Sequence, residues 1–267
     1  MNTPLIEAVL VVLREVLEFA LLVGILLAAG AQVGARGRWL LAALGVGLAG
    51  AWGYMRSMGA ISAWFDGVGY ELVNAGLQIL VYGLLLGVIG LLARYPGRAP
   101  AAFGWLAAAA IVSAITREGS EILLYLSAFE GRPQAVPDLL LGAVLGGGVG
   151  FSAGALLYYL LRGLPQRWAG RVTVLLLALV GAGMWSQASA LLIQADWLPS
   201  HAPLWDSSAV LPENSLPGQL LYALMGYEAT PGPWQVALTA FALGAALLTA
   251  TAGTWLRVHP NGDRDHD

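Results

Sequence analysis

The sequence predicts an all-α, polytopic membrane protein with seven transmembrane helices. Of its 267 residues, 58% are hydrophobic and only 11% are charged, whereas an average soluble domain carries about 25% charged residues. Several apolar runs reach the roughly 20 residues that an α-helix needs to cross a bilayer. The chain contains no Cys, which excludes disulfides and thiolate metal sites. These features argue against a soluble enzyme and favour a protein that resides in the lipid bilayer.

Seven apolar runs are expected to be helices, because a segment in lipid must satisfy its own backbone polar groups. They cover residues 5–29, 38–60, 70–93, 101–128, 138–162, 170–194 and 234–256. Residues 5–29 are interpreted as a retained helix, since no basic region precedes them and charges interrupt the run, unlike in a signal peptide. We expect residues 1–256 to form one transmembrane domain and residues 257–267 to form a cytoplasmic tail.

Arginine placement predicts the orientation, because cytoplasmic segments carry an excess of basic residues. The connections after the first, third and fifth helices and the segment after the seventh hold most of the arginines: Arg36, Arg38, Arg94, Arg98, Arg162, Arg167, Arg171, Arg257 and Arg264. These segments fall on one side, which we assign to the cytoplasm. The other side is mainly acidic, so the N-terminus is expected outside and the C-terminus inside.

The longest connection, about 195–233, is predicted to lie outside. It is rich in Pro and Trp and has no basic residue, so much of it cannot form one continuous helix. Either an ordered cap that docks a partner or a plain solvated loop fits this composition. Asp206, Glu213 and Glu228 are candidates for gathering cations at an entrance, although such charges often only solvate a loop.

A charged motif, R-E-x-x-E, occurs in two of the apolar runs. The first copy is Arg14, Glu15 and Glu18, and the second is Arg117, Glu118 and Glu121. The copies lie in the first and fourth predicted helices, so the two motif helices must run in opposite directions. This spacing predicts two inverted three-helix repeats, about 5–93 and 101–194, followed by a seventh helix. Transporters built in this way place the substrate site near the bilayer midplane, where the repeats meet.

The chemistry of the two motifs indicates a cation. The glutamates of each copy are three residues apart and share a helical face, and an ionised residue at the bilayer centre costs at least about 2.5–3.5 kcal/mol. Four carboxylates and two guanidiniums leave a formal surplus of two negative charges. Hard oxygen ligands without Cys, His or Met suit iron(III), or less selectively iron(II), manganese, calcium or magnesium. Alternatively, the charges only neutralise each other and lock two helices together.

The doubled motif in a seven-helix chain resembles the oxidase-dependent iron permeases, which include the fungal high-affinity iron permease and the bacterial Efe-type ferrous iron permease. The resemblance covers most of the chain and extends to "LWDSSAVLPENSLPGQLLYALMGYEATP" (204–231). It implies a permease for iron, taken as iron(III) after oxidation by a separate ferroxidase, in a bacterial cytoplasmic membrane. A periplasmic ferroxidase or iron-binding protein is the partner that it implies.

The resemblance also assigns roles to residues. It implies that the metal-handling carboxylates are Glu15, Glu18, Glu118 and Glu121, with Arg14 and Arg117 as their charge partners. The family usually has Gly at the third motif position, which is Gly119 in the second copy but Val16 in the first. Glu71 resembles an acidic position of the family, although a carboxylate at a helix start is favoured there in any case.

No catalytic residue, permanently bound cofactor or nucleic-acid partner is expected, so the chain is predicted to be a transporter and not an enzyme. Iron enters this prediction only as the transported substrate. Two alternatives remain open. One is a transporter of another divalent metal or of a proton-coupled solute. The other is a non-transporting membrane subunit whose external segment docks a partner.

Overall fold

The computed structural model describes residues 3–35, 37–98, 100–129 and 131–258 and is entirely helical over them, apart from the connections. Its elements are α1 (Thr3–Gln32), α2 (Arg38–Ser62), the 3-10 turn η1 (Phe65–Gly67), α3 (Gly69–Arg94), α4 (Ala101–Ser127), α5 (Val136–Gly163), α6 (Gln166–Gln194), α7 (Leu216–Met225) and α8 (Pro233–Val258). The all-α prediction is confirmed, with a helix at each of the seven predicted ranges. Apart from Arg257 and Val258, the predicted tail lies outside the described residues.

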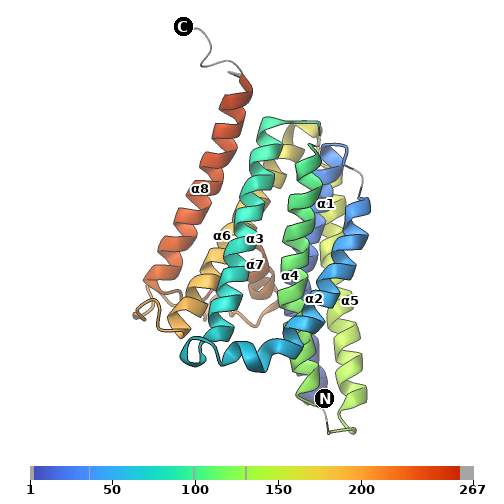
Figure 1. Ribbon diagram of the computed structural model, residues 1–267, viewed down its shortest axis with the longest axis vertical. Helices are drawn as coiled ribbons and strands as arrows, with labels where there is room; N and C mark the ends of the chain where they lie inside the picture. Colours follow the sequence, from blue (N-terminus) through green and yellow to red (C-terminus); the bar gives the residue numbers. More distant parts are fainter. Residues whose placement is uncertain (1–2, 36, 99, 130, 259–267) are drawn as a thin grey trace.

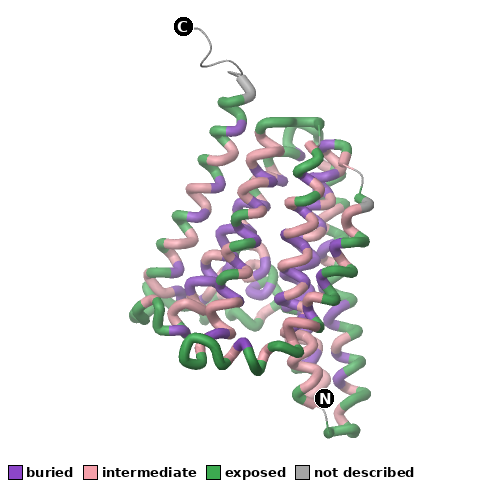
Figure 2. Tube along the Cα trace, in the orientation of Figure 1, coloured by how far each residue is buried: buried purple, intermediate pink, exposed green. Residues whose placement is uncertain are grey.

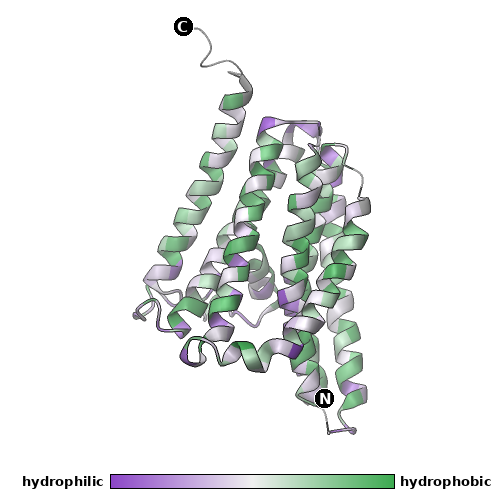
Figure 3. Cartoon of the chain, viewed as in Figure 1, coloured by the Kyte–Doolittle hydropathy of each residue, from purple (hydrophilic) through white to green (hydrophobic). Residues whose placement is uncertain are grey.

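Five helices in the described part of the chain are long and apolar enough to cross a membrane: α3, α4, α5, α6 and α8. The other two long helices have sufficient length but differ in composition. α1 has 30 residues, and its apolar run is interrupted by the charges of the first motif. α2 has 25 residues and carries Arg56 near its end. Figure 3 shows hydrophilic positions gathered in the connections, with apolar stretches along the helices between them. The chain is therefore a membrane protein by composition and length of its helices.

The helices pack into a bundle around α1, α3, α4 and α6 (Figure 1). α1 lies along α5, α4 lies along α2, and α3 lies along α6, while α8 contacts α6 and α3 from outside. Burial is greatest at the faces where these helices meet (Figure 2). Leu22, Ile25, Leu85, Ile111 and Leu177 are among the fully buried side chains of the main core. The core is thus built from both halves of the chain.

Small residues let α1 and α5 approach closely. Gly142, Gly146, Gly150 and Gly154 repeat every four residues on α5, and a Cβ at each would collide with α1. At Gly146, such an atom would lie 2.5 Å from the backbone oxygen of Val9. Close approach of this kind drives helix association in membranes, where lipid is as apolar as the side chains.

The third motif positions take part in the same kind of packing. Val16 is buried and lies so close to Gly150 that a Cβ there would be 2.7 Å from Val16 Cγ1. In the other motif helix, a Cβ at Gly119 would lie 2.9 Å from the Cβ of Ala51 on α2. Val16 therefore does not loosen the first motif helix, because the glycine that permits close packing lies on the partner helix.

The connection between α6 and α8 contains an α-helix that the sequence analysis did not predict. α7 begins after Ser215, whose side chain accepts a hydrogen bond from the Gly218 N–H, and it ends at Gly226 with φ 65°. These are a common N-cap and a common left-handed C-cap. The helix packs against α6 and α1, with Ala223 against a cluster of leucines on α1. A plain solvated loop is therefore wrong for this part of 195–233.

The arginine-rich connections lie at one end of the bundle. One cavity of about 740 Å³, which we call the inner cavity, lies at this end. It is lined by residues from 31–33, 92–97, 161–174 and 250–254. The end of α1, the segment leading into α4, the α5–α6 connection and the end of α8 therefore meet there. Because the end of α1 and the start of α4 share this side, the two motif helices run in opposite directions, as predicted.

We expect Gly146→Ala to lower the midpoint of thermal unfolding in detergent, because overpacking a close contact costs about 1–3 kcal/mol. A Cβ added at Gly148, two residues away on α5, would meet no atom within 4 Å. Gly148→Ala is the matched control and should leave stability unchanged or raise it, since Ala favours a helix over Gly by about 1 kcal/mol. Equal midpoints for the two variants would contradict the close α1–α5 contact.

Candidate functional site: a carboxylate cluster between two motif helices

Three of the predicted metal carboxylates converge between α1 and α4. Glu15, Glu118 and Glu121 each offer an oxygen, and these atoms all lie within 4.8 Å of one another. We call these three residues the carboxylate cluster. Oxygens that bind one ion at about 2.0–2.6 Å lie up to about 4–5 Å apart, so a single cation can contact all three. Glu15 and Glu118 are almost completely buried, whereas the side chain of Glu121 remains 25% exposed.

One oxygen of the carboxylate cluster has no partner. Glu118 Oε1 contacts Arg117, but Glu118 Oε2 is buried and has no hydrogen-bond partner among the described residues. A buried polar atom without a partner costs about 1–3 kcal/mol, and more when it is charged. Such atoms are rare in folded proteins and call for an explanation. A cation in the carboxylate cluster would give this oxygen a partner.

The fourth predicted carboxylate, Glu18, lies outside the carboxylate cluster and has several partners. Its Oε1 is 3.8 Å from Arg14 Nε, and its Oε2 is 3.5 Å from Arg117 Nη1. The side-chain amide of Gln187 also donates to Oε2 at 3.0 Å. Glu18 therefore connects the two arginines that sequence analysis assigned as charge partners.

The two arginines have different environments. Arg117 is buried, and its guanidinium contacts Glu118 directly and lies 3.5 Å from oxygens of Glu18 and Glu121. The Arg14 side chain is 48% exposed, with its guanidinium 4.2 Å from the ring centroid of Tyr222 on α7. Arg117 thus bridges both motifs, whereas Arg14 connects the first motif to α7.

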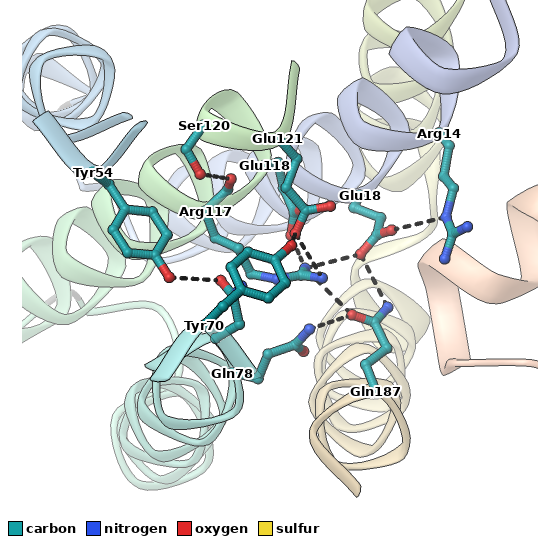
Figure 4. A network of polar contacts seen from close by, with 11 residues as sticks. Arg14, Glu18, Tyr54, Tyr70, Gln78, Arg117, Glu118, Ser120, Glu121 and Gln187 are labelled. Atoms are coloured by element: carbon teal, nitrogen blue, oxygen red, sulfur yellow. Dashed lines mark hydrogen bonds and ion pairs between the residues drawn. The ribbon is translucent and has the colours of Figure 1, made fainter. Parts of the chain in front are cut away.

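Two amide side chains at this site were missed in the sequence analysis. Gln187 of α6 accepts a hydrogen bond from Arg117 at 3.4 Å and donates one to Glu18, and Gln78 of α3 donates to Gln187 (Figure 4). Both glutamines are buried. A lone amide within an otherwise apolar span is the signal that could have identified them, because a buried amide needs partners.

Tyrosines of α2 and α3 approach the site from another side. Tyr70 donates to Glu121 Oε1 at 3.5 Å, and Tyr54 donates to Asn74 at 3.3 Å (Figure 4). The site is therefore surrounded by α1, α2, α3, α4 and α6, with α7 next to Arg14. The hydroxyls supply polar contacts beside the most exposed carboxylate of the carboxylate cluster.

Glu71 and the three candidate entrance residues lie outside the carboxylate cluster, and Glu213 and Glu228 are near each other. Glu71 is in the first turn of α3 and has a buried oxygen without a hydrogen-bond partner among the described residues. Asp206 accepts from the Ser208 N–H, Glu213 from the Ala229 N–H and Glu228 from Gln235. The last three carboxylates therefore each form a hydrogen bond that organises residues 195–235.

The carboxyls of the connection differ in their pKa values. Burial raises the pKa of Glu228, although its hydrogen bond with Gln235 opposes this shift. Hydrogen bonds from Ser208 lower the pKa of Asp206, which is fully exposed. A role for these residues and for Glu71 at an entrance stays a prediction.

Removing Arg117 should destabilise the protein far more than removing Arg14. Arg117→Gln leaves buried carboxylates uncompensated, which costs about 3–5 kcal/mol. Arg14→Gln removes one half-exposed ion pair, worth about 0–1 kcal/mol, and a cation–π contact with Tyr222, worth about 0.5–1 kcal/mol. Thermal or denaturant unfolding in detergent measures both variants, and Arg117→Gln combined with Glu118→Gln should recover part of the loss. Similar stability of the two single variants would contradict the central position of Arg117.

Comparisons with family models, with curated proteins and with solved structures find no match to this chain. The chemistry of the site is therefore inferred from its own residues. Those residues are three carboxylates within reach of one ion, a buried arginine that contacts one further carboxylate, and two buried amides from neighbouring helices.

Proposed function

We propose that this protein is a permease that moves iron across the cytoplasmic membrane of a bacterium, through the paired motifs of α1 and α4. The resemblance of these motifs to those of oxidase-dependent iron permeases supports iron as the substrate. The observation that carries the proposal is the carboxylate cluster, in which oxygens from both motif helices lie within 4.8 Å of one another. Hard carboxylate oxygens without sulfur or imidazole ligands favour a hard cation.

The pattern of helix packing supports two inverted repeats of three helices. If α1, α2 and α3 correspond to α4, α5 and α6, the contact of α1 with α5 corresponds to that of α4 with α2. The contact of α3 with α4 corresponds in the same way to that of α6 with α1. Such an arrangement would put the carboxylate cluster where the repeats meet, as in other transporters with inverted repeats. We propose α1 and α2 as two further membrane-spanning helices, which gives seven spans.

Charge balance explains how the site could accept and release an ion. Four carboxylates and two guanidiniums leave two negative charges, so an iron(II) ion balances the site and an iron(III) ion leaves one positive charge. Without an ion, Arg117 offsets part of the charge of Glu118 and Glu121. A cation that enters the carboxylate cluster would take over these oxygens, while Arg117 keeps its contact with Glu18. Arginine pairing of this kind lowers the cost of an empty site.

The proposed path begins at the outer face, passes the carboxylate cluster and ends in the cytoplasm. Glu121 is the most exposed member of the carboxylate cluster, so it would receive the ion first and transfer it to Glu15 and Glu118. The resemblance to the oxidase-dependent iron permeases implies that a separate ferroxidase would oxidise the iron before entry. Residues 195–233, which include α7, are the proposed docking surface for such a partner.

Iron entry into liposomes that contain the purified protein tests this function. Glu15→Gln and Glu118→Gln each remove one ligand charge with little change in shape, and both should abolish entry. Glu7→Gln is the matched control, because Glu7 is an exposed carboxylate on the same helix. It should transport iron like the wild type.

Both oxidation states should be supplied in separate experiments, and manganese and calcium should compete in parallel. Entry that is equal in the wild type and in both cluster variants would contradict the proposed path. Entry of manganese or calcium in preference to iron would instead favour a transporter of another divalent metal.

The three ion pairs of Arg117 favour a second candidate, a docking subunit in which the charges only hold the helices together. Glu15 forms no ion pair among the described residues, so Glu15→Gln separates the two functions. A protein that uses these charges for assembly alone should keep its folding and its partner binding in this variant. A permease should fold but lose iron entry, because the carboxylate cluster loses the charge of one of its three carboxylates.

A further inference from the structure

The inner cavity lies at the opposite end of α1 from its N-terminus, apart from the carboxylate cluster. Its volume of about 740 Å³ falls within the range of about 300–1,000 Å³ that is typical of small-molecule sites. It is bounded by the ends of α1, α3, α5 and α8 and by the start of α6. Neither motif contributes to its lining, so its ligand must be recognised by other residues.

The lining of the inner cavity carries positive charge. Arg162 lies in the last turn of α5, while Arg167 and Arg171 lie in the first two turns of α6, and all three line the inner cavity. No acidic residue occurs among its described lining residues. None of the three arginines forms a salt bridge with another described residue. Three guanidiniums that have no carboxylate partner within the described part of the chain attract an anion and repel a cation.

Apart from the arginines and a few Gln and Thr side chains, the walls of the inner cavity are apolar. Leu92, Leu161, Val174 and Ala250 come from four different helices and line it together. Trp168, which is half exposed, lies with its ring centroid 5.7 Å from the Arg171 guanidinium. Trp is enriched at the boundary between lipid headgroups and acyl chains. Trp168 beside Arg171 favours a position of the arginines at headgroup level, with an apolar surface adjoining them.

We propose that the inner cavity binds an anionic phospholipid. Guanidinium groups bind phosphate oxygens through paired, charge-assisted hydrogen bonds, and basic pockets between transmembrane helices bind anionic headgroups. The apolar walls receive the glycerol and upper acyl region. A small soluble anion would use only the polar groups of the lining, whereas an anionic lipid uses both its polar and its apolar parts.

Lipid binding to the purified protein in a neutral detergent tests the proposal, with native mass spectrometry as the readout. The probes are phosphatidylglycerol and phosphatidylcholine. The wild type should bind phosphatidylglycerol more tightly. Arg167→Gln combined with Arg171→Gln should weaken this binding about thirtyfold, since each arginine near the headgroups contributes about 1 kcal/mol and about 1.4 kcal/mol corresponds to tenfold.

The matched control removes two arginines from the same end of the bundle. Arg94 and Arg98 do not line the inner cavity, so Arg94→Gln combined with Arg98→Gln should keep the affinity within about twofold of the wild type. Arg162→Gln combined with Arg171→Gln provides a second test pair if the first pair does not fold. Equal affinities in cavity and control variants, or equal binding of the two lipids, would overturn the proposal.

Two further measurements distinguish a lipid from a soluble anion. Ala250→Phe fills part of the apolar wall without changing charge, and it should weaken phosphatidylglycerol binding. Millimolar inorganic phosphate should leave the lipid bound. Displacement of the lipid by phosphate, together with unchanged binding to Ala250→Phe, would overturn the lipid proposal in favour of a soluble anion.

Discussion

The interior of the bundle depends on the ionic contacts of the Arg117 guanidinium. Glu15, Glu18 and Glu118 are all buried, and burying an unpaired carboxylate costs several kcal/mol. Arg117 contacts carboxylates from both α1 and α4, and its neighbour Gln187 connects it to α6. One cation therefore compensates charge that two separate helices bring into the interior. The compensation is incomplete, because the carboxylates outnumber the guanidiniums, and under the proposed function this deficit would favour a further cation.

Close packing of helix backbones positions these charges. α1 approaches α5 through the glycines of α5, and α4 approaches α2 through Gly119 and Ala51. At the third position of the first motif, Val16 on α1 packs against the small residue Gly150 on α5. At the third position of the second motif, the small residue is Gly119 on α4 itself, which packs against Ala51 on α2. The separation of the carboxylates is therefore determined by backbone contacts along the whole length of the helices. A fixed separation matters because an ion selects ligands by distance as well as by charge.

The two polar regions of the bundle have opposite character. The carboxylate cluster is acidic and partly buried, whereas three arginines line the inner cavity. Under the proposed function, a cation released from the carboxylate cluster would be repelled by the inner cavity and would leave by another surface of the bundle. An anionic lipid bound in the inner cavity, as we propose, would reduce this repulsion.

The sequence by itself determined the all-helical architecture, the seven long helices and the two charged motifs, because hydrophobic length and intramembrane charge are local properties. It also determined the antiparallel course of α1 and α4, which follows from counting helices. It did not indicate α7, since a short helix between prolines has no long apolar run, nor the contact of Arg14 with Tyr222. Only the tertiary structure decided that Glu15, Glu118 and Glu121 converge while Glu18 pairs with both arginines. Spacing along a helix defines a shared face, but the distance between side chains of different helices depends on how closely their backbones pack.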